Sequence, residues 1–226
     1  MNIGLIVAAG RSERFDGGEK QFASLAGRPV LSYSLSAFAA AAAVDSIIIV
    51  VREEDRERCR AEVVEPVDPV KKTSIVAGGV ARQESVAAGL KACPRGTGLV
   101  WVHDGARPLI TAAQIDAMAA DLNDLDGLIL AAPAVDTIKQ VEDGVIQRTI
   151  PRDQLWQAQT PQLFRFTTLS QAHLIAAQSG FCATDDSALV ELVGGRVGVR
   201  PNDQNNLKVT TAADMLVAEQ VLSSLS

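Results

Sequence analysis

The sequence has few of the residues from which disulfide scaffolds and zinc sites are built. Its 226 residues include three cysteines, Cys59, Cys93 and Cys182, and two histidines. Isolated cysteines in an odd number argue against a disulfide framework, and the scarcity of histidine argues against a Cys/His zinc site. We therefore expect a protein of a reducing compartment.

A basic surplus and a long apolar run are also missing. Lysine and arginine number 21 against 27 aspartates and glutamates, a formal net charge of −6, so the overall field repels nucleic acids and anionic membranes. The apolar N-terminus turns polar at Arg11, too early for a membrane span, and it lacks the basic start of a signal peptide. These absences predict a cytoplasmic protein with no nucleic-acid or membrane partner, in which an anionic substrate must meet a local group of cations.

The residues that are present suffice for a substantial core. Hydrophobic residues make up 47% of the chain, and the length predicts a single domain over residues 1–226. Apolar residues recur at helical spacing over 31–42, after Pro29. Short, almost continuously apolar runs typical of strands buried on both faces lie at residues 2–7, 46–51, 99–103 and 128–131. This alternation predicts an α/β fold with a Rossmann-like, twisted, mostly parallel sheet flanked by helices, whose ligands bind beyond the carboxyl ends of the strands.

The later part of the chain departs from this rhythm. Two β-prone runs, 135–140 and 145–150, flank Asp143 and Gly144, and Asp-Gly between such runs is a hairpin signal. The hairpin could extend the main sheet or project as a β-arm at about 134–153, and the residues favour neither reading. Beyond it we expect helices at 166–178 and 184–193, extended segments at 196–200 and 206–209, and a final helix with Thr211 as its N-cap.

Three segments that follow predicted strands carry candidate chemistry. Ala8-Ala9-Gly10 is followed by Arg14 and Lys20; small residues let backbone amides approach a ligand, and the two cations suit phosphates. This segment matches neither a Walker A loop nor a Gly-x-Gly-x-x-Gly fingerprint, and taken alone it fits a solvated loop equally well.

The other two segments are equally ambiguous in isolation. Gly78-Gly79 leads into a predicted helix and could present backbone groups to a base edge, while Ser85 could cap that helix or contact the base. Asp104 ends an apolar strand, where a metal or hydroxyl ligand belongs, although an aspartate there is more often a turn residue.

In combination, these segments resemble the 2-C-methyl-D-erythritol 4-phosphate cytidylyltransferases from about residue 3 to residue 222. The resemblance rests on an ordered set of motifs: Ala8-Ala9-Gly10, Arg14, Lys20-Gln21, Gly78-Gly79, Arg82, Ser85, His103-Asp104-Gly105-Ala106-Arg107-Pro108, Asp136-Thr137, Arg152, Leu155-Trp156, Thr160-Pro161-Gln162, Thr184-Asp185 and Asn206-Leu207-Lys208-Val209-Thr210. It implies an enzyme that joins CTP to methylerythritol phosphate with Mg²⁺ or Mn²⁺, releases pyrophosphate and works as a homodimer.

The resemblance also implies roles for individual residues. Arg14 and Lys20 would stabilise the transition state at the α-phosphate of CTP, and Asp104 would contact substrate hydroxyls near the metal ion. CTP itself would be bound by Ala8, Ala9, Gly10, Gly79, Arg82 and Ser85. The acceptor would be held by Thr137, Arg152, Thr184 and Lys208, the first two on an arm that reaches into the partner subunit.

Two departures from the family pattern bear on these roles. Glu19 stands before Lys20, where the family commonly has proline, which leaves the rigidity of that loop open. Val80 and Ala81 follow Gly78-Gly79, where acidic or polar residues are common, so base contacts there would come mainly from the backbone. From the early end of the chain we expect a monofunctional enzyme. The alternatives are a ribitol 5-phosphate cytidylyltransferase, a non-catalytic nucleotide-binding regulator, and a sugar-1-phosphate nucleotidyltransferase for another base.

Overall fold

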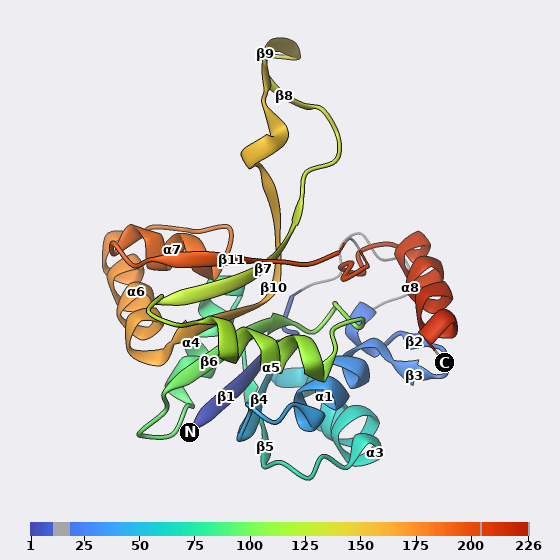
Figure 1. The fold of residues 1–226 in the computed structure, drawn as a ribbon. Helices are drawn as coiled ribbons and strands as arrows, with labels where there is room; N and C mark the ends of the chain where they lie inside the picture. The colour runs from blue at the N-terminus through green and yellow to red at the C-terminus, as the bar shows by residue number, and fades with distance from the viewer. Residues whose placement is uncertain (11–18, 204, 226) are drawn as a thin grey trace.

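The computed structural model describes residues 1–10, 19–203 and 205–225. Its core is a seven-stranded sheet (Figure 1). The strand order is β11-β7-β10-β6-β1-β4-β5. All neighbours pair in parallel except β10, which runs antiparallel to both β6 and β7. The strands are β1 (Asn2–Val7), β4 (Ser46–Val51), β5 (Thr73–Ala77), β6 (Leu99–Asp104), β7 (Gly127–Pro133), β10 (Trp156–Arg165) and β11 (Val197–Pro201). The four predicted apolar strands and the mostly parallel sheet are confirmed.

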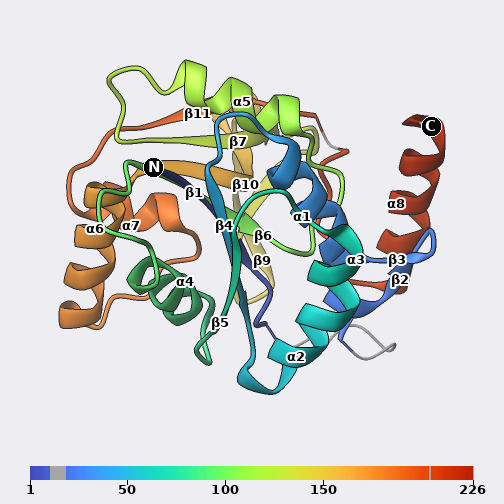
Figure 2. The same ribbon diagram turned by 90° about the horizontal axis from the view of Figure 1, so that it is seen from below.

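Helices cover both faces of the sheet (Figure 2). One core packs α1 (Val30–Ala40) and α5 (Ala112–Asp121) against strand residues such as Ile6 and Trp101. The other core packs α4 (Arg82–Lys91), α6 (Phe166–Ser179) and α7 (Asp186–Leu192) against residues such as Leu5. Leu5 and Ile6 are adjacent and both fully buried, because successive side chains of a strand point to opposite faces. The continuous apolar runs in the sequence therefore reflect burial on two sides.

The remaining elements outside the hairpin are mostly short, apart from the C-terminal helix α8. They are η1 (Lys20–Phe22), β2 (Ser24–Leu25), β3 (Arg28–Pro29), η2 (Glu53–Asp55), α2 (Arg56–Cys59), η3 (Arg60–Val64), α3 (Glu65–Val67), η4 (Arg152–Gln154) and α8 (Ala212–Leu225). None of the helices within the described ranges has the length and apolar character needed to cross a membrane.

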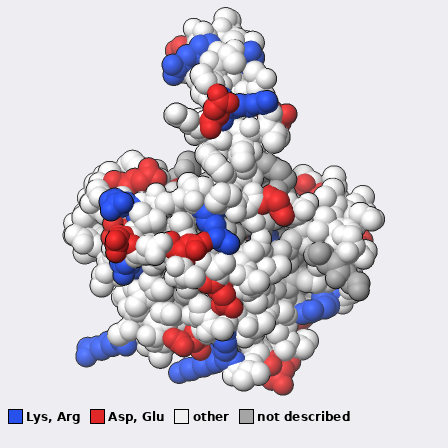
Figure 3. All heavy atoms as spheres, in the orientation of Figure 1, with Lys and Arg blue, Asp and Glu red and all other residues white. Residues whose placement is uncertain are grey.

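The predicted hairpin is a separate two-stranded sheet, β8 (Ile138–Glu142) and β9 (Val145–Ile150). It projects from the body as an arm rather than extending the main sheet (Figure 1). Asp143 and Gly144 both have positive φ, 48° and 77°, as a tight hairpin turn requires. On the face drawn in Figure 3, cationic and anionic side chains are interspersed, and the arm carries both signs.

The structure differs from the sequence-based expectations in two extended segments, one strand that they lack and one that they include. Strand β10 was not predicted: its sequence is rich in glutamine and contains Pro161, and its pairing with β7 shifts register between Ala158 and Gln162. Residues 206–209, predicted to be extended, form no strand. Their polar contacts go to other segments, as where Val209 N donates to Ala106 O over 2.8 Å.

The predicted N-cap of the last helix is confirmed. Asp214 N donates to Thr211 Oγ1 over 3.3 Å, while the Asp214 carboxylate accepts from Thr211 N over 2.8 Å. These reciprocal bonds satisfy backbone donors that the start of α8 would otherwise leave unpaired.

Candidate active site

A cavity opens at the carboxyl ends of β1 and β6, where the sheet topology places ligands. We call it the β1 cavity. Of the predicted site residues, its described lining contains Ala8, Gly10, Lys20, Arg82, Ser85, Asp104 and Lys208, together with Val7, Gln21, Val80, Ala81 and Ala106. The fold therefore gathers residues from distant parts of the chain. Arg14, also predicted here, lies outside the described residues.

A second cavity, the β10 cavity, adjoins the first. It is lined by Arg82, Asp104, Arg107, Ala158, Gln159, Thr160, Gln162, Thr184, Asp185 and Lys208. Three residues, Arg82, Asp104 and Lys208, belong to both linings. Two ligands placed in the two cavities would consequently meet at these three side chains.

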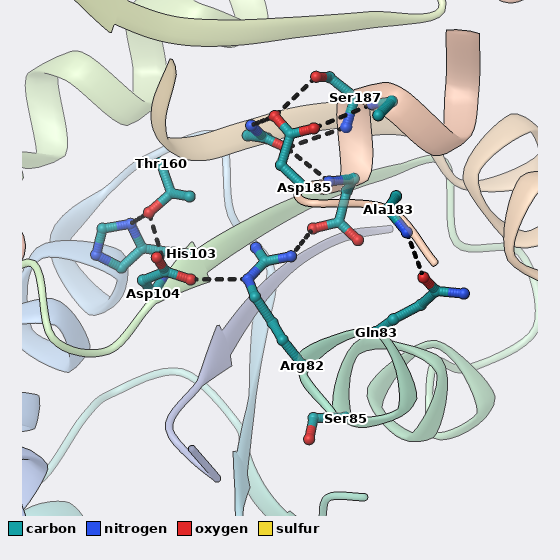
Figure 4. A network of polar contacts seen from close by, with 12 residues as sticks. Arg82, Gln83, Ser85, His103, Asp104, Thr160, Ala183, Asp185 and Ser187 are labelled. Atoms are coloured by element: carbon teal, nitrogen blue, oxygen red, sulfur yellow. Dashed lines mark hydrogen bonds and ion pairs between the residues drawn. The ribbon is translucent and has the colours of Figure 1, made fainter. Parts of the chain in front are cut away.

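A chain of polar contacts runs through the junction formed by Arg82, Asp104 and Lys208, and Figure 4 shows its part between Arg82 and Asp104. Asp104 binds Arg82 Nε through one oxygen at 3.1 Å and Lys208 Nζ through the other at 2.7 Å. Arg82 continues to Asp186 at 2.7 Å, and Asp186 to His173 at 3.0 Å. Asp186 is 1% exposed, so these contacts hold Arg82 from behind and fix the direction in which Asp104 points.

The junction keeps a surplus of positive charge. Burial opposes ionisation of Asp104, but the charges of Arg82 and Lys208 outweigh it and hold its pKa well below the usual range. Burial likewise opposes ionisation of Asp186, and Arg82 again lowers its pKa. Arg107 Nε lies 4.0 Å from Asp104. Across the two linings there are four cationic side chains, Lys20, Arg82, Arg107 and Lys208, against the carboxylates of Asp104 and Asp185, with Asp186 behind Arg82; one positive charge is therefore left for an anionic ligand.

The glycine pair lies where side chains would collide. A Cβ at Gly78 would lie 2.6 Å from the Cβ of Ala9, and a Cβ at Gly79 would lie 2.4 Å from Glu84 Cβ. Ser85 Oγ accepts from Gly79 N over 3.2 Å and donates to a nearby carbonyl such as Ala81 O at 3.1 Å. Ser85 thus orders the backbone that the sequence suggests for base contact. Ala9 and Gly79 themselves support the β1 cavity without lining it.

Ser85 is not the N-cap of α4. The N-cap position is Ala81, and the capping carboxylate is that of Glu84, which accepts from Val80 N at 2.8 Å and Ala81 N at 3.1 Å. The interpretation of Ser85 as a helix cap is therefore wrong.

His103, on β6 beside the site, is held as a neutral ring. Thr160 Oγ1 accepts from Asp104 N at 3.0 Å and so directs its own proton to His103 Nδ1 at 3.2 Å. The other ring nitrogen, Nε2, then carries the proton and donates to Arg107 O at 3.2 Å. Burial lowers the pKa of His103 to about 3, so its role here is to orient Thr160 and the strand ends rather than to transfer protons at neutral pH.

This neutral histidine makes stability pH-dependent. In the unfolded chain His103 takes up a proton below about pH 6.5, whereas the folded protein resists protonation down to about pH 3. Between about pH 6 and pH 4 we expect the free energy of unfolding to fall by up to about 1.4 kcal/mol per pH unit more than in His103→Gln. Urea unfolding across this range tests the difference. An NMR titration showing the His103 ring protonating near pH 6.5 would contradict the assignment.

Two cavities that meet at cationic side chains are consistent with the enzyme family that the motifs suggest. Comparison with known sequences decides whether the chain belongs to that family. A family model described as IspD, 2-C-methyl-D-erythritol 4-phosphate cytidylyltransferase, matches residues 3–224. The chain belongs to this family. It is therefore an enzyme of the cytidylyltransferase type, as the motifs predicted.

Individual relatives agree over nearly the whole chain. A 2-C-methyl-D-erythritol 4-phosphate cytidylyltransferase from Syntrophotalea carbinolica is 41% identical over 222 residues, 97% of this chain and 95% of that protein. A bifunctional enzyme IspD/IspF from Desulforudis audaxviator is 43% identical over 222 residues, 97% of this chain and 56% of that longer protein. The crystal structure of 4-diphosphocytidyl-2C-methyl-D-erythritol synthase from Anaerococcus prevotii superposes with a TM-score of 0.87 at 28% identity, covering 99% and 96% of the two chains.

Two residues that the cytidylyltransferase resemblance assigns to the acceptor lie away from both cavities. Thr137 and Arg152 are exposed at the base of the arm, and neither lines the β1 or the β10 cavity. Arg152 Nη1 donates to Val135 O. Thr184 and Lys208, by contrast, line the β10 cavity, so one subunit brings together only part of the predicted acceptor set.

The described residues fit a metal ion carried by the substrate better than one caged by protein. Within the described chain there is no group of three or more histidine, cysteine or acidic side chains that could hold a metal ion. Asp104 is the acidic residue among those that line the β1 cavity. Mg²⁺ in nucleotide enzymes commonly uses one or two carboxylates and completes its shell with phosphates and water. Asp104 with a triphosphate meets that requirement.

The sequence alone does not identify Asp186 and His173, the residues behind Arg82 in this cytidylyltransferase. Both are buried and bound to one another. Asp186 lies 104 positions from Arg82, so no local pattern pairs them. The available signal was a second aspartate after Thr184-Asp185, at the start of a predicted helix.

Proposed function

We propose that this protein transfers the cytidylyl group of CTP to 2-C-methyl-D-erythritol 4-phosphate, forming 4-diphosphocytidyl-2-C-methyl-D-erythritol and pyrophosphate. The observation that carries the proposal is the meeting of two cavities at Arg82, Asp104 and Lys208. A transferase needs two reactant sites that share one reacting centre, whereas a nucleotide-binding regulator needs only one. Family membership supplies the identity of the two reactants.

In our proposal CTP occupies the β1 cavity in one orientation. Cytosine would contact backbone groups around Gly79, which Ser85 orders, because the apolar side chain of the neighbouring Val80 cannot form hydrogen bonds with a base. The triphosphate then extends past Gly10 towards Lys20, which lines the same cavity. In our proposal Lys20 and Arg14 stabilise the charge that develops on the α-phosphate during transfer.

The acceptor occupies the β10 cavity. Its phosphate is already anionic near neutral pH, so attack on the α-phosphorus needs no strong general base, and the neutral His103 is consistent with this. The main obstacle is repulsion between two anions, which Lys208 and the junction's surplus charge reduce while holding the reactants in line. Thr184 lines this cavity and positions the polyol or its phosphate.

A divalent ion completes the proposed charge balance. Mg²⁺ or Mn²⁺, brought by CTP and held near Asp104, would neutralise phosphate charge and polarise the phosphoryl oxygens. Both Asp104 oxygens are bound to cations, Arg82 and Lys208, so an ion held near Asp104 would share this carboxylate with them. Lys208 also lines the β10 cavity, where it would bind the acceptor phosphate.

We further propose that the acceptor site is completed in a homodimer. Thr137 and Arg152 lie on the arm, outside the cavities of their own subunit. The arm also exposes Val141, Val145 and Ile146, which an isolated protomer would leave in water. Docking the arm on a second copy would bury these side chains and bring both polar residues to the partner's β10 cavity.

Isolated, unpaired cysteines and the net charge of −6 support a cytoplasmic setting with no nucleic-acid or membrane partner.

A substrate panel tests reaction, base and acceptor together. Pyrophosphate release is measured with CTP, UTP, ATP or GTP against methylerythritol phosphate or ribitol 5-phosphate, with Mg²⁺ present. We expect clear release only with CTP and methylerythritol phosphate, because family membership favours this pair. Preference for ribitol 5-phosphate, or efficient use of a purine nucleotide, would overturn the proposal.

A further inference from the structure

Lys20 is flanked by two residues that are fastened to the body of the protein. Glu19 precedes it, and its carboxylate binds Arg52 at 2.9 Å. Gln21 follows it, is 2% exposed, and donates from Nε2 to Glu19 Oε2 over 3.2 Å. Lys20 itself lines the β1 cavity. The contacts of Glu19 and Gln21 therefore fix the position of the Lys20 backbone, from which its side chain extends.

Arg52 connects these residues to the sheet. It directly follows β4, which is paired on both edges with β1 and β5, so it begins where a central strand ends. Its guanidinium also binds Asp55 at 2.7 Å, and the Asp55 side chain is 8% exposed. Asp55 thereby holds Arg52 in the orientation that meets Glu19.

Packing adds to the same attachment. Phe22 N donates to Glu19 O over 2.9 Å, which closes the short η1 turn around Lys20. The Phe22 ring is buried, and the Arg58 guanidinium stacks 4.4 Å from its centroid. The Glu19 ion pair thus lies directly before Lys20 and the buried Phe22 ring two residues after it.

We propose that Glu19, Arg52 and Asp55 form a clasp that positions Lys20 for phosphoryl chemistry by tying the residue before the lysine to the end of β4. The inference rests on the proposed function, because it assigns these residues a role in the same transfer. The Glu19 and Arg52 side chains are 23% and 22% exposed, which shields their attraction from solvent more than at a fully exposed pair.

Substitution at Glu19 separates positioning from binding. Glu19→Ala is expected to lower kcat by about 10- to 100-fold, because a displacement of the lysine of the order of 1 Å weakens transition-state contacts. The KM for CTP should change by less than about threefold, since base and triphosphate contacts from other segments remain. Glu19 has φ −79°, within the range of proline, so Glu19→Pro should return kcat to within about threefold of the natural enzyme.

Salt gives a readout that a purely structural role would not move. Raising ionic strength from about 0.05 M to about 0.5 M screens partly exposed charges. At saturating CTP and acceptor, we expect kcat of the natural enzyme to fall more than that of Glu19→Pro, which lacks the ion pair. Arg52→Lys, which keeps the charge but not the two-sided guanidinium contact, should give an intermediate kcat.

Arg56→Ala is the matched control, since it removes the exposed pair between Arg56 and Glu53 a few residues away and should leave kcat unchanged. Thermal unfolding of each variant detects loss of folding. Unchanged kcat in Glu19→Ala, or equal loss in Glu19→Ala and Glu19→Pro, would overturn the clasp. If the natural enzyme itself releases no pyrophosphate from CTP and methylerythritol phosphate, the proposed function fails instead.

Discussion

Replacement of Lys20 by alanine is expected to lower kcat by about 10²- to 10³-fold, the usual cost of removing one preorganised charge or donor from a transition state. The KM for CTP should change much less, because the backbone around Gly79 that we propose to contact the base is unaltered, and the charge that Lys20 meets grows only during transfer. Steady-state kinetics with saturating methylerythritol phosphate measure both constants.

Lys72→Ala provides the control for that experiment. Lys72 is exposed and lies outside both the β1 and the β10 cavity, so removing its charge should leave turnover unaffected. Normal turnover in Lys20→Ala would remove the proposed transition-state role. A rise in KM with kcat unchanged would instead make Lys20 a simple binding residue.

With acceptor well below the KM of Arg152→Ala, a mixture of Lys20→Ala and Arg152→Ala subunits is expected to recover about one quarter of natural activity, although each variant alone is nearly inactive under that condition. If Lys20 comes from one subunit and Arg152 from the partner's arm, a mixed dimer contains one site with both residues intact and one with neither. Random reassociation of equal amounts makes about half of the dimers mixed, which gives the expected fraction. Pyrophosphate release after denaturation and refolding of the mixture measures it.

Arg152→Ala alone should raise the KM for the acceptor while sparing that for CTP, since Arg152 lines no part of the β1 cavity. Absence of recovery in a mixture whose mixed dimers have been demonstrated, for instance by mass spectrometry, would place both residues in sites confined to one subunit. The arm would then need another explanation.

The buried strands were predictable because burial on two faces leaves a signature in adjacent residues. Both β1 and β4 consist almost entirely of apolar side chains, and no helical surface pattern competes with that reading. The arm was predictable as a hairpin from Asp143 and Gly144, but its direction was not. Whether a hairpin joins a sheet depends on distant neighbours, which a local pattern does not encode.

Strand β10 shows the opposite situation. It sits in the middle of the sheet, yet Gln157, Gln159 and Thr160 make it look like a loop. The buried Gln159 and Thr160 side chains find partners that only the folded chain supplies; Gln159, for example, binds Asn206 at 3.1 Å. Polar groups in a buried strand are tolerated because they are hydrogen-bonded, and the sequence alone does not reveal such bonds.

The candidate site was predictable in membership more than in geometry. Parallel strands end at one edge of a sheet, so motifs that follow β1 and β6 had to meet. The attachment of Arg82 to both Asp104 and Asp186 was not foreseeable, and it changes the expectation for Arg82. Its guanidinium is engaged with carboxylates, so it organises the junction between the reactants more than it binds CTP.

The antiparallel insertion of β10 has a consequence for biosynthesis. The half-sheet β5-β4-β1-β6 is complete once Asp104 has been made, but the free edge of β6 is covered only by β10, which ends at Arg165. A nascent chain must therefore carry an open, apolar strand edge through translation of the whole arm, at the stage when such edges recruit other chains. Slow translation of residues 105–165 would lengthen the time for which this edge is exposed. The rate of translation would then affect the yield of correctly folded enzyme.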